Sequence, residues 1–402
     1  MLWPTSDGVL IANATLPDGK PYDIDVEGGR IAALLPGSSD ARRDALDLGG
    51  ALLLPPLVDG HIHLDKTLLG LPWVPNQATG SRVADRIEDE RKVRATRTVP
   101  EAETGANLVR QVLASGTLHM RSHVDIDNQL GLRNLHEILK VRERFHDLVT
   151  IEIVAFPQSG VLRSPGTADL LDAAIAEGAD LLGGLDPVGI DGDLDGHLNA
   201  IFDIAERRSV GIDIHLHDGG EGGIAELLAV AARTKAAGLS GKVAVSHAFA
   251  LGSVPTARAA ETADALADAG VAIMSHGPGA ATMPPLLLLR QHGVEVFGGS
   301  DNIRDAWSPF GNGDMLDRAM MIGYRANFRH DHELSVAYEM VTSAAARVLG
   351  LNDYGLQVGN CADFFAIAAG SIAEAIATRP PRKLVVKAGR VVARDGMLEA
   401  SP

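Results

Sequence analysis

The middle of the chain alternates between two hydrophobic patterns. Short, largely apolar runs typical of buried strands cover residues 117–124, 149–156, 181–185, 211–217, 243–247, 271–275 and 294–299, and an eighth run precedes His61. Amphipathic stretches separate many of these runs, at residues 101–114, 167–177, 193–208, 224–237 and 256–269. This alternation predicts an α/β protein with a parallel sheet, and eight such strands are the number that closes a (β/α)8 TIM barrel.

Both ends of the chain show a different pattern, in which short strands are separated by turns. Strand-like runs occur at residues 9–14, 22–26, 30–35 and 51–54, and again at 362–367, 383–387 and 390–393. We expect the two ends to meet in one small β-sandwich, the alternative being two unrelated tails. The predicted domains are therefore 1–56 plus 356–402 for the sandwich and 57–355 for the barrel.

Composition narrows the classes of partner. The 402 residues are 46% hydrophobic and 22% charged, as in an ordinary globular protein, and the net charge of −16 should repel nucleic acids and anionic membranes. Apolar stretches such as 283–289 are far shorter than the roughly 20 residues of a membrane span, and the N-terminal residues do not resemble a signal peptide. We expect a soluble, cytoplasmic protein that binds a small molecule.

Polar residues of the kinds that bind metals follow nearly every predicted strand. They include His61, His63, His123, Asp125, Gln158, Asp186, His215, His217, Asp218, His247, His276 and Asp301. Barrel enzymes place their active sites at the C-terminal ends of the strands. A doubly wound sheet also binds ligands there, but it usually has an early glycine-rich phosphate turn, and the glycines at 219–223 follow a late strand.

His61 and His63 form the first part of a candidate metal site. Imidazoles at positions i and i+2 of an extended segment point to the same side, so both can reach one ion. His215 and Asp301 would complete a ligand set suited to zinc or ferrous iron, and His247 would face the same pocket. The alternative for each single histidine is a hydrogen-bonded residue on the rim of the barrel.

The ordered pattern HxH…H…H…D resembles that of the amidohydrolase superfamily, whose members are metal-dependent hydrolases on a distorted (β/α)8 barrel. Residues 55–66, 121–125, 155–160 and 300–315 resemble the cytosine deaminase branch. The motifs HLDK, HLHD and SDNIRDAWSPFGNGDM are most similar to those of its aminotriazine-degrading members.

This resemblance implies one divalent ion per chain, Zn²⁺ or Fe²⁺, because the strand at 181–185 lacks the lysine that bridges two metals in binuclear relatives. The implied ligands are His61, His63, His215 and Asp301. Asp301 would also take a proton from the attacking water and deliver it to the leaving nitrogen. His247 would polarise the attacking oxygen, and Asp218 stands where cytosine deaminases have a proton-shuttling glutamate.

The resemblance also implies a set of substrate-binding residues: Lys66, Gln158, His217, Asn302 and Trp307. Asn302 replaces an aspartate of the cytosine deaminases, and with Asp218 it makes cytosine itself a less favoured substrate. Lys66 would favour an electron-rich or anionic ring, unless it pairs with Asp65 or Asp59 instead.

We therefore expect a hydrolase, most similar to deaminases, that cleaves an exocyclic C–N bond of a cytosine-, aminotriazine-, purine- or pterin-like heterocycle. The alternatives are an amidohydrolase that opens a cyclic amide and a non-catalytic binding protein. We also expect a homo-oligomer, the usual state of such barrel hydrolases. Cys361 is expected to be a small buried residue, and the roles of His123 and His276 remain open.

Overall fold

A parallel barrel forms the centre of the computed structural model, which describes residues 8–37, 45–76, 80 and 82–399. Its strands follow one another in sequence order: β6 (Leu57–Ile62), β7 (Thr117–Asp125), β8 (Thr150–Phe156), β9 (Leu181–Leu185), β10 (Gly211–Leu216), β11 (Val243–His247), β12 (Val271–Ser275) and β13 (Val296–Gly298). Between β13 and β6 the ladder is reduced to a bridge, in which the Asp301 amide donates to the His61 carbonyl at 2.7 Å. The predicted distorted TIM barrel is confirmed.

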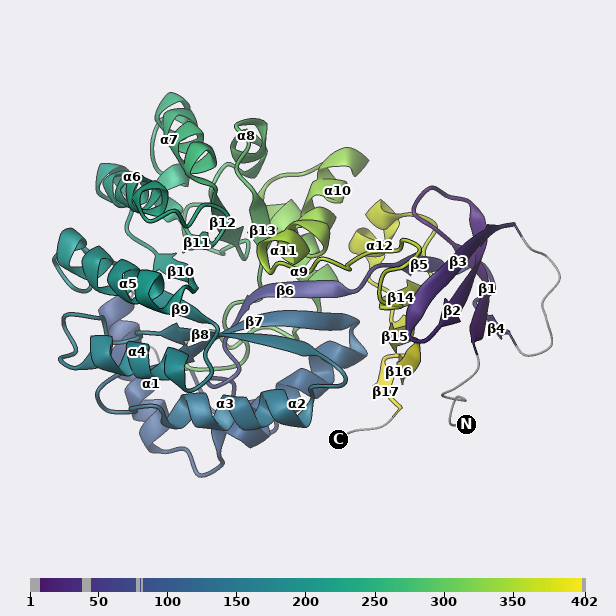
Figure 1. Cartoon of the computed structure of the whole chain (residues 1–402), viewed down its shortest axis with the longest axis horizontal. Coiled ribbons are helices and arrows are strands. Elements are labelled where there is room, and N and C mark those ends of the chain that lie inside the picture. Colours follow the sequence, from purple (N-terminus) through teal and green to yellow (C-terminus); the bar gives the residue numbers. More distant parts are fainter. Residues whose placement is uncertain (1–7, 38–44, 77–79, 81, 400–402) are drawn as a thin grey trace.

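Helices surround the barrel (Figure 1). Those that follow the strands are α2 (Glu101–Ala114), α3 (Arg133–Arg144), α4 (Thr167–Ala176), α5 (Leu194–Arg208), α6 (Gly220–Ala236), η1 (Phe249–Gly252), α7 (Thr256–Ala269), α8 (Leu286–Gln291), α9 (Met315–Arg325), α10 (Asp331–Met340) and α11 (Ser343–Val348). The five amphipathic stretches found in the sequence match α2, α4, α5, α6 and α7 to within a few residues. A further helix, α1 (Val83–Ala95), has no apolar stripe and was not predicted.

Both ends of the chain join in one separate nine-stranded sheet, as expected (Figure 1). Its strands are β1 (Val9–Thr15), β2 (Pro21–Glu27), β3 (Arg30–Pro36), β4 (Leu46–Asp47), β5 (Leu52–Leu54), β14 (Phe364–Ile367), β15 (Arg382–Lys387), β16 (Arg390–Arg394) and β17 (Met397–Leu398). Antiparallel pairing of β5 with β14 connects the N-terminal and C-terminal halves.

Neighbouring residues of this sheet contribute to two different cores. Phe364 lies in a core within the small sheet, whereas Phe365 packs in the main core with the barrel helices. Leu53 and Leu54 divide in the same way, because successive side chains of a strand point to opposite faces. One face of the sheet therefore attaches it to the barrel. We propose that residues 1–56 with 356–402, and 57–355, are the two structural units.

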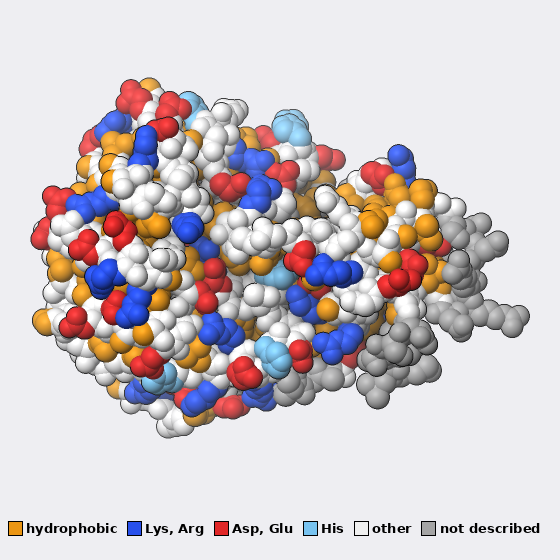
Figure 2. All heavy atoms as spheres, viewed as in Figure 1, with side chains coloured by type: hydrophobic (Ala, Val, Ile, Leu, Met, Phe, Trp, Pro, Cys, Tyr) orange, Lys and Arg blue, Asp and Glu red, His pale blue; other side chains and the backbone are white. Residues whose placement is uncertain are grey.

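The surface carries charges of both signs. Basic and acidic side chains are interspersed on the face shown in Figure 2. Within the described residues, no helix is both long and apolar enough to cross a membrane. Cys361 is only partly buried and donates its thiol to Asp353 at 3.0 Å, so the prediction of a small buried residue was wrong. Burial and the Asp353 carboxylate raise the pKa of this thiol to about 11, which disfavours a nucleophilic role.

Candidate active site

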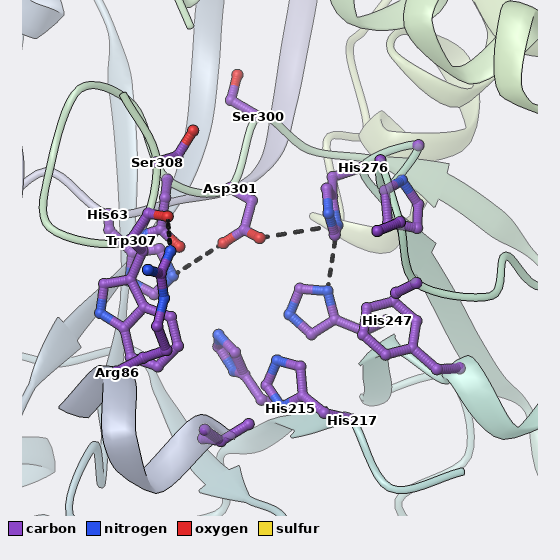
Figure 3. Close-up of a pocket in the computed structure, with 18 of the residues that line it drawn as sticks. His63, Arg86, His215, His217, His247, His276, Ser300, Asp301, Trp307 and Ser308 are labelled. Atoms are coloured by element: carbon purple, nitrogen blue, oxygen red, sulfur yellow. Dashed lines mark hydrogen bonds and ion pairs between the residues drawn. The ribbon is translucent and has the colours of Figure 1, made fainter. Parts of the chain in front are cut away.

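His61, His63 and Asp301 converge at the point where the ends of the barrel sheet meet. The Nε2 atoms of His61 and His63 are 3.3 Å apart, and Asp301 Oδ1 lies 3.6 Å from the first and 3.3 Å from the second. Figure 3 shows Asp301 between His63 and His276, with His215, His217 and His247 across the cavity. The bridge between β13 and β6 therefore places the carboxylate next to the two histidines of β6.

The other ring nitrogens of these histidines fix their tautomers. His63 Nδ1 lies 3.2 Å from the His123 carbonyl oxygen, which can only accept, so Nδ1 carries the proton. His61 Nδ1 lies 2.9 Å from Ser246 Oγ, whose hydroxyl donates to Asp213 at 2.9 Å, so here too Nδ1 is the donor. With Nδ1 as the donor in both rings, Nε2 of each ring is the atom left to offer a lone pair.

Three acceptor atoms thus face one another without a proton donor, and this arrangement fits a divalent cation. Nitrogen ligands at 2.0–2.1 Å from a tetrahedral zinc ion lie about 3.3 Å apart, as the two Nε2 atoms do here. Hydrogen bonds that orient the second nitrogen of each ligand, such as those from His61 and His63, are typical of metal sites.

His215 extends the ligand set, with its ring centroid 4.5 Å from that of His61 and 5.5 Å from that of His63. His61, His215 and His247 each offer an atom within 4.8 Å of the others, and this triple shares His61 with the triple that contains Asp301. Both ring nitrogens of His215 are buried and lack a hydrogen-bond partner in the described part of the chain. A buried imidazole without partners is costly, and a metal ligand role would remove that cost.

Burial disfavours the charged form of four histidines of the cluster. It lowers the pKa of His63 and of His276 to about 4, and it lowers the pKa of His215 and of His247 well below the usual value. Neutral imidazole is the form that binds a metal. His217 is the exception, since the Asp186 carboxylate outweighs the effect of burial and raises the pKa of His217.

A network of buried hydrogen bonds and ion pairs lies next to the histidine cluster. Asp213 accepts from Ser246 and also pairs with Arg121 at 2.9 Å, while Arg121 pairs with Glu152 at 2.6 Å. His123 stacks on the ring of His61 with 3.9 Å between centroids. Ser246 and Asp213 were not predicted as site residues, and their positions on adjacent strands of the barrel are the one signal that could have indicated them.

His276 joins the cluster from the end of β12. Its Nδ1 lies 3.2 Å from His247 Nδ1 and 3.7 Å from Asp301 Oδ2. His247, Asp301 and Asp186 all have positive φ angles, of 76°, 60° and 36°. Such left-handed conformations are strained for residues other than glycine and cluster at functional sites, and here they occur as strands end.

The cluster lies in a cavity of about 1330 Å³, whose wall includes most of the predicted site residues. His63, His215, His247 and Asp301 line it, as do Lys66, Gln158, His217, Asp218, Asn302 and Trp307. The structure thus brings the predicted catalytic and substrate-binding residues to one pocket. His61 lies beneath it, fully buried.

Lys66 contacts both the pocket wall and a group of buried carboxylates. Its Nζ lies 3.2 Å from Asp125 and 3.5 Å from Glu90, and it also donates to Gln158 Oε1. Burial opposes the ammonium charge, but these carboxylates outweigh it and raise the pKa of Lys66. The ion-pair partners are therefore not Asp65 or Asp59, which the sequence had suggested. Trp307 is tied to the same group, because its Nε1 donates to Glu90 at 2.5 Å.

The opposite wall is built around His217 and Asp218. Asp186 accepts from the His217 backbone amide at 2.6 Å and from Nδ1 at 2.9 Å, so the ring has a fixed orientation. His217 also stacks on His247, with 4.5 Å between ring centroids.

Asn302 donates to Asp305 at 2.6 Å, and Asp305 in turn accepts from the Trp307 amide, so this bond supports the loop that carries Trp307.

Fold and site together define a metal-dependent hydrolase on a distorted α/β barrel. The family model described as the amidohydrolase family matches residues 44–393. The chain is 32% identical over 400 residues to N-isopropylammelide isopropyl amidohydrolase of Pseudomonas sp. strain ADP, covering 98% of both chains. It therefore belongs to the amidohydrolase family.

Solved structures agree with this assignment. The structure of N-isopropylammelide isopropylaminohydrolase from Burkholderia multivorans is similar with a TM-score of 0.93 and 46% identity, covering 97% of this chain and 99% of that one. The structure of 5-methylcytosine deaminase from Klebsiella pneumoniae, liganded with 5-fluorocytosine, is similar with a TM-score of 0.87 and 25% identity, covering 96% and 97%. Both similarities extend across the barrel and the sheet of the chain ends.

Proposed function

We propose that this protein is a metal-dependent hydrolase that removes an amine from a ring carbon of a nitrogen heterocycle. The convergence of His61, His63 and Asp301 as unprotonated ligand atoms beside a large pocket carries the proposal. Relatives named for N-isopropylammelide and 5-methylcytosine support an exocyclic C–N bond as the one that is cleaved. The product is a ring carbonyl with ammonia or an alkylamine.

One divalent ion, Zn²⁺ or Fe²⁺, would be held by His61, His63, His215 and Asp301. When bound there, the ion would supply a water whose pKa is lowered towards neutrality and which could then act as a nucleophile. Asp301 accepts the proton that this water loses and later donates it to the leaving nitrogen. Asp301 Oδ2 points towards His276, so the two carboxylate oxygens can serve the ion and the proton separately.

The remaining pocket residues bind and polarise the ring. His247 hydrogen-bonds the attacking oxygen, and Asp218 exchanges a proton with the ring. Gln158 can both donate to and accept from a heterocycle edge, and Trp307 covers the ring face. Lys66, His217 and Asn302 complete the substrate contacts, with Lys66 favouring electron-rich ring atoms because of its positive charge.

The two alternative functions make different predictions about metal content. Opening of a cyclic amide usually uses two metals bridged by a lysine at the end of the fourth strand, and β9 contains no lysine. A non-catalytic binding protein would not need the full set of His61, His63, His215, His247 and Asp301, all of which lie together here.

The test combines metal analysis with a panel of cytosine, isoguanine, ammelide, N-alkylammelides, pterins and creatinine. We expect one metal ion per chain and release of ammonia or an alkylamine from at least one member. Asp301→Asn should reduce kcat by at least about 10³-fold, since it removes the proton acceptor, while Asp317→Asn on α9 serves as a control. Two metals per chain with ring opening would overturn the proposal, as would an active Asp301→Asn enzyme.

A further inference from the structure

Glu226 is a buried carboxyl group that the reaction as described does not use. It lies on α6, only 1% exposed, beside the core residues Ile224 and Leu227. The ion pairs that connect α6 with its neighbouring helices use Glu221 with Arg258 at 3.0 Å, Arg233 with Asp195 at 2.8 Å, and Lys235 with Asp268. Among the described residues, Glu226 forms no ion pair with a Lys or Arg. An ionised carboxylate in this position would be costly.

Consecutive backbone amides of the loop after β9 place Glu226 next to Asp218. The Val188 amide donates to Glu226 Oε2 at 3.3 Å, and the Gly189 amide donates to Asp218 Oδ2 at 2.7 Å. These adjacent donors bring the two carboxyl groups close enough for each to alter the pKa of the other. A Cβ atom at Gly189 would lie 2.4 Å from Asp218 Oδ1, so a glycine is needed for this close approach.

The charges around the pair favour one proton between them. Asp186, Asp218 and Glu226 face one another, and the imidazole of His217, which lies 2.9 Å from Asp186, is the basic group that faces them. Burial, together with Asp218, raises the pKa of Glu226 to about 8. Near neutral pH the proton therefore resides on Glu226, which donates to an ionised Asp218.

We propose that Glu226 is a positioning residue that, as a neutral acid, donates a hydrogen bond to the Asp218 carboxylate and fixes it at the pocket wall. This role rests on the proposed function, in which Asp218 exchanges a proton with the ring. Glu226 keeps its own proton throughout. When alkaline pH removes that proton, the hydrogen bond is lost, two like charges face each other, and turnover falls.

Three variants of the holoenzyme test this role. Glu226→Gln keeps a donor for Asp218 and an acceptor for the Val188 amide, so it should retain most of kcat and should lose the alkaline decline above about pH 8. Glu226→Leu has a similar size but neither bond, and it should lower kcat by roughly 10²-fold with metal content unchanged. Glu221→Gln, on the exposed first turn of α6, should resemble the parent enzyme.

A double-mutant cycle separates positioning from a general structural effect. In an Asp218→Asn background, Glu226→Leu should have little additional effect on kcat, because the group that it positions is already altered. Full additivity of the two effects would overturn the proposal. An alkaline limb that persists unchanged in Glu226→Gln would overturn it as well.

Thermal unfolding tests the protonated state without any substrate. The pKa of Glu226 is raised in the fold, so its contribution to stability is present below the unfolded-state value of about 4.3 and is lost as pH rises towards 8. Glu226→Gln cannot ionise, so its Tm should exceed that of the parent by a margin that widens from about pH 5 to pH 8. A constant difference would show that Glu226 is ionised in the fold and would overturn the proposal even if the heterocycle panel shows turnover. If the Tm difference widens with pH but no member of the heterocycle panel is turned over, the protonated state of Glu226 is supported and the proposed function is contradicted.

Discussion

The Lys66 ammonium lies where the pocket meets a group of buried carboxylates. On one side it contacts Asp125 and Glu90, and on the other it donates to Gln158 and lies 5.4 Å from the ring centroid of Trp307. The same charge therefore has two effects: it stabilises buried acids whose other cationic neighbour is Arg94, and it orients residues of the pocket wall. A single residue can contribute to both stability and specificity because its amine has three donors.

Lys66→Ala should separate these two effects. We expect KM to rise more for hydroxylated or anionic heterocycles than for neutral ones, because a positive charge in the pocket wall is lost. We also expect the free energy of unfolding to fall, by less than the roughly 3 to 5 kcal/mol of a fully uncompensated buried charge, because Arg94 still faces both carboxylates. Steady-state kinetics and chemical denaturation measure the two effects.

Lys92→Ala is the matched control for this prediction, because Lys92 pairs with Asp89 on α1 and its side chain is 60% exposed. It should alter neither KM nor stability appreciably. Equal increases in KM for neutral and anionic rings in Lys66→Ala would contradict a substrate contact and would leave only the structural effect.

At the scale of elements, helix α1 contributes residues that hold the pocket wall, although no hydrophobic pattern in the sequence predicts it. Its buried residues are Ile87, Asp89 and Glu90, so two of the three are acidic and no apolar stripe marks the helix. The helix packs near the pocket through polar contacts: Glu90 accepts from Trp307 Nε1, and Arg86 donates to the Trp307 carbonyl. α1 therefore positions an aromatic wall of the pocket.

Glu90→Ala should leave the Trp307 side chain less firmly positioned, because the indole loses its hydrogen-bond acceptor. Loss of a hydrogen bond to a charged acceptor costs about 1.5 to 3 kcal/mol, so KM should rise roughly tenfold or more if Trp307 covers the substrate ring. The emission of Trp307, one of three tryptophans, should shift as its indole loses the partner. Glu88→Ala, on the same helix with a side chain 58% exposed, is the control. An unchanged KM with an altered emission would show that Trp307 does not contact the substrate.

At the scale of the whole molecule, the barrel and the sheet of the chain ends share a core. Phe365 from β14 packs in the main core with residues of α2 and β7, while the adjacent Phe364 packs within the small sheet. Both are fully buried. Because the two faces of β5 and of β14 belong to different cores, the small sheet packs directly against the barrel along these two strands.

We expect one cooperative unfolding transition for the whole chain. Phe365→Ala and Phe364→Ala should each lower the free energy of unfolding by about 3 to 5 kcal/mol, since each removes a buried aromatic side chain. Calorimetry should show a single peak that moves in both variants. A separate early peak that moves only in Phe364→Ala would show that the small sheet unfolds independently of the barrel.

The fold could be predicted in large part from local patterns. Most barrel strands are largely apolar runs, and β9 and β12 are buried on both faces, so these strands are visible without tertiary information. The helix α1 could not be found in this way, because its buried face is acidic and has meaning only next to Lys66 and Trp307. Local patterns predicted that the two chain ends meet, but they could not show that β5 pairs with β14, because these strands lie more than 300 residues apart.

The sequence by itself determined which residues reach the centre of the barrel, because the ends of parallel strands meet at one face and ligand-type residues follow those strands. His61, His63, His215, His247 and Asp301 belong to that set. Only the tertiary structure decided the chemical state of each group, because protonation depends on burial and on partners from other strands. Lys66 pairs with carboxylates from β7 and α1. The pKa of Glu226 is raised because the fold buries it next to Asp218.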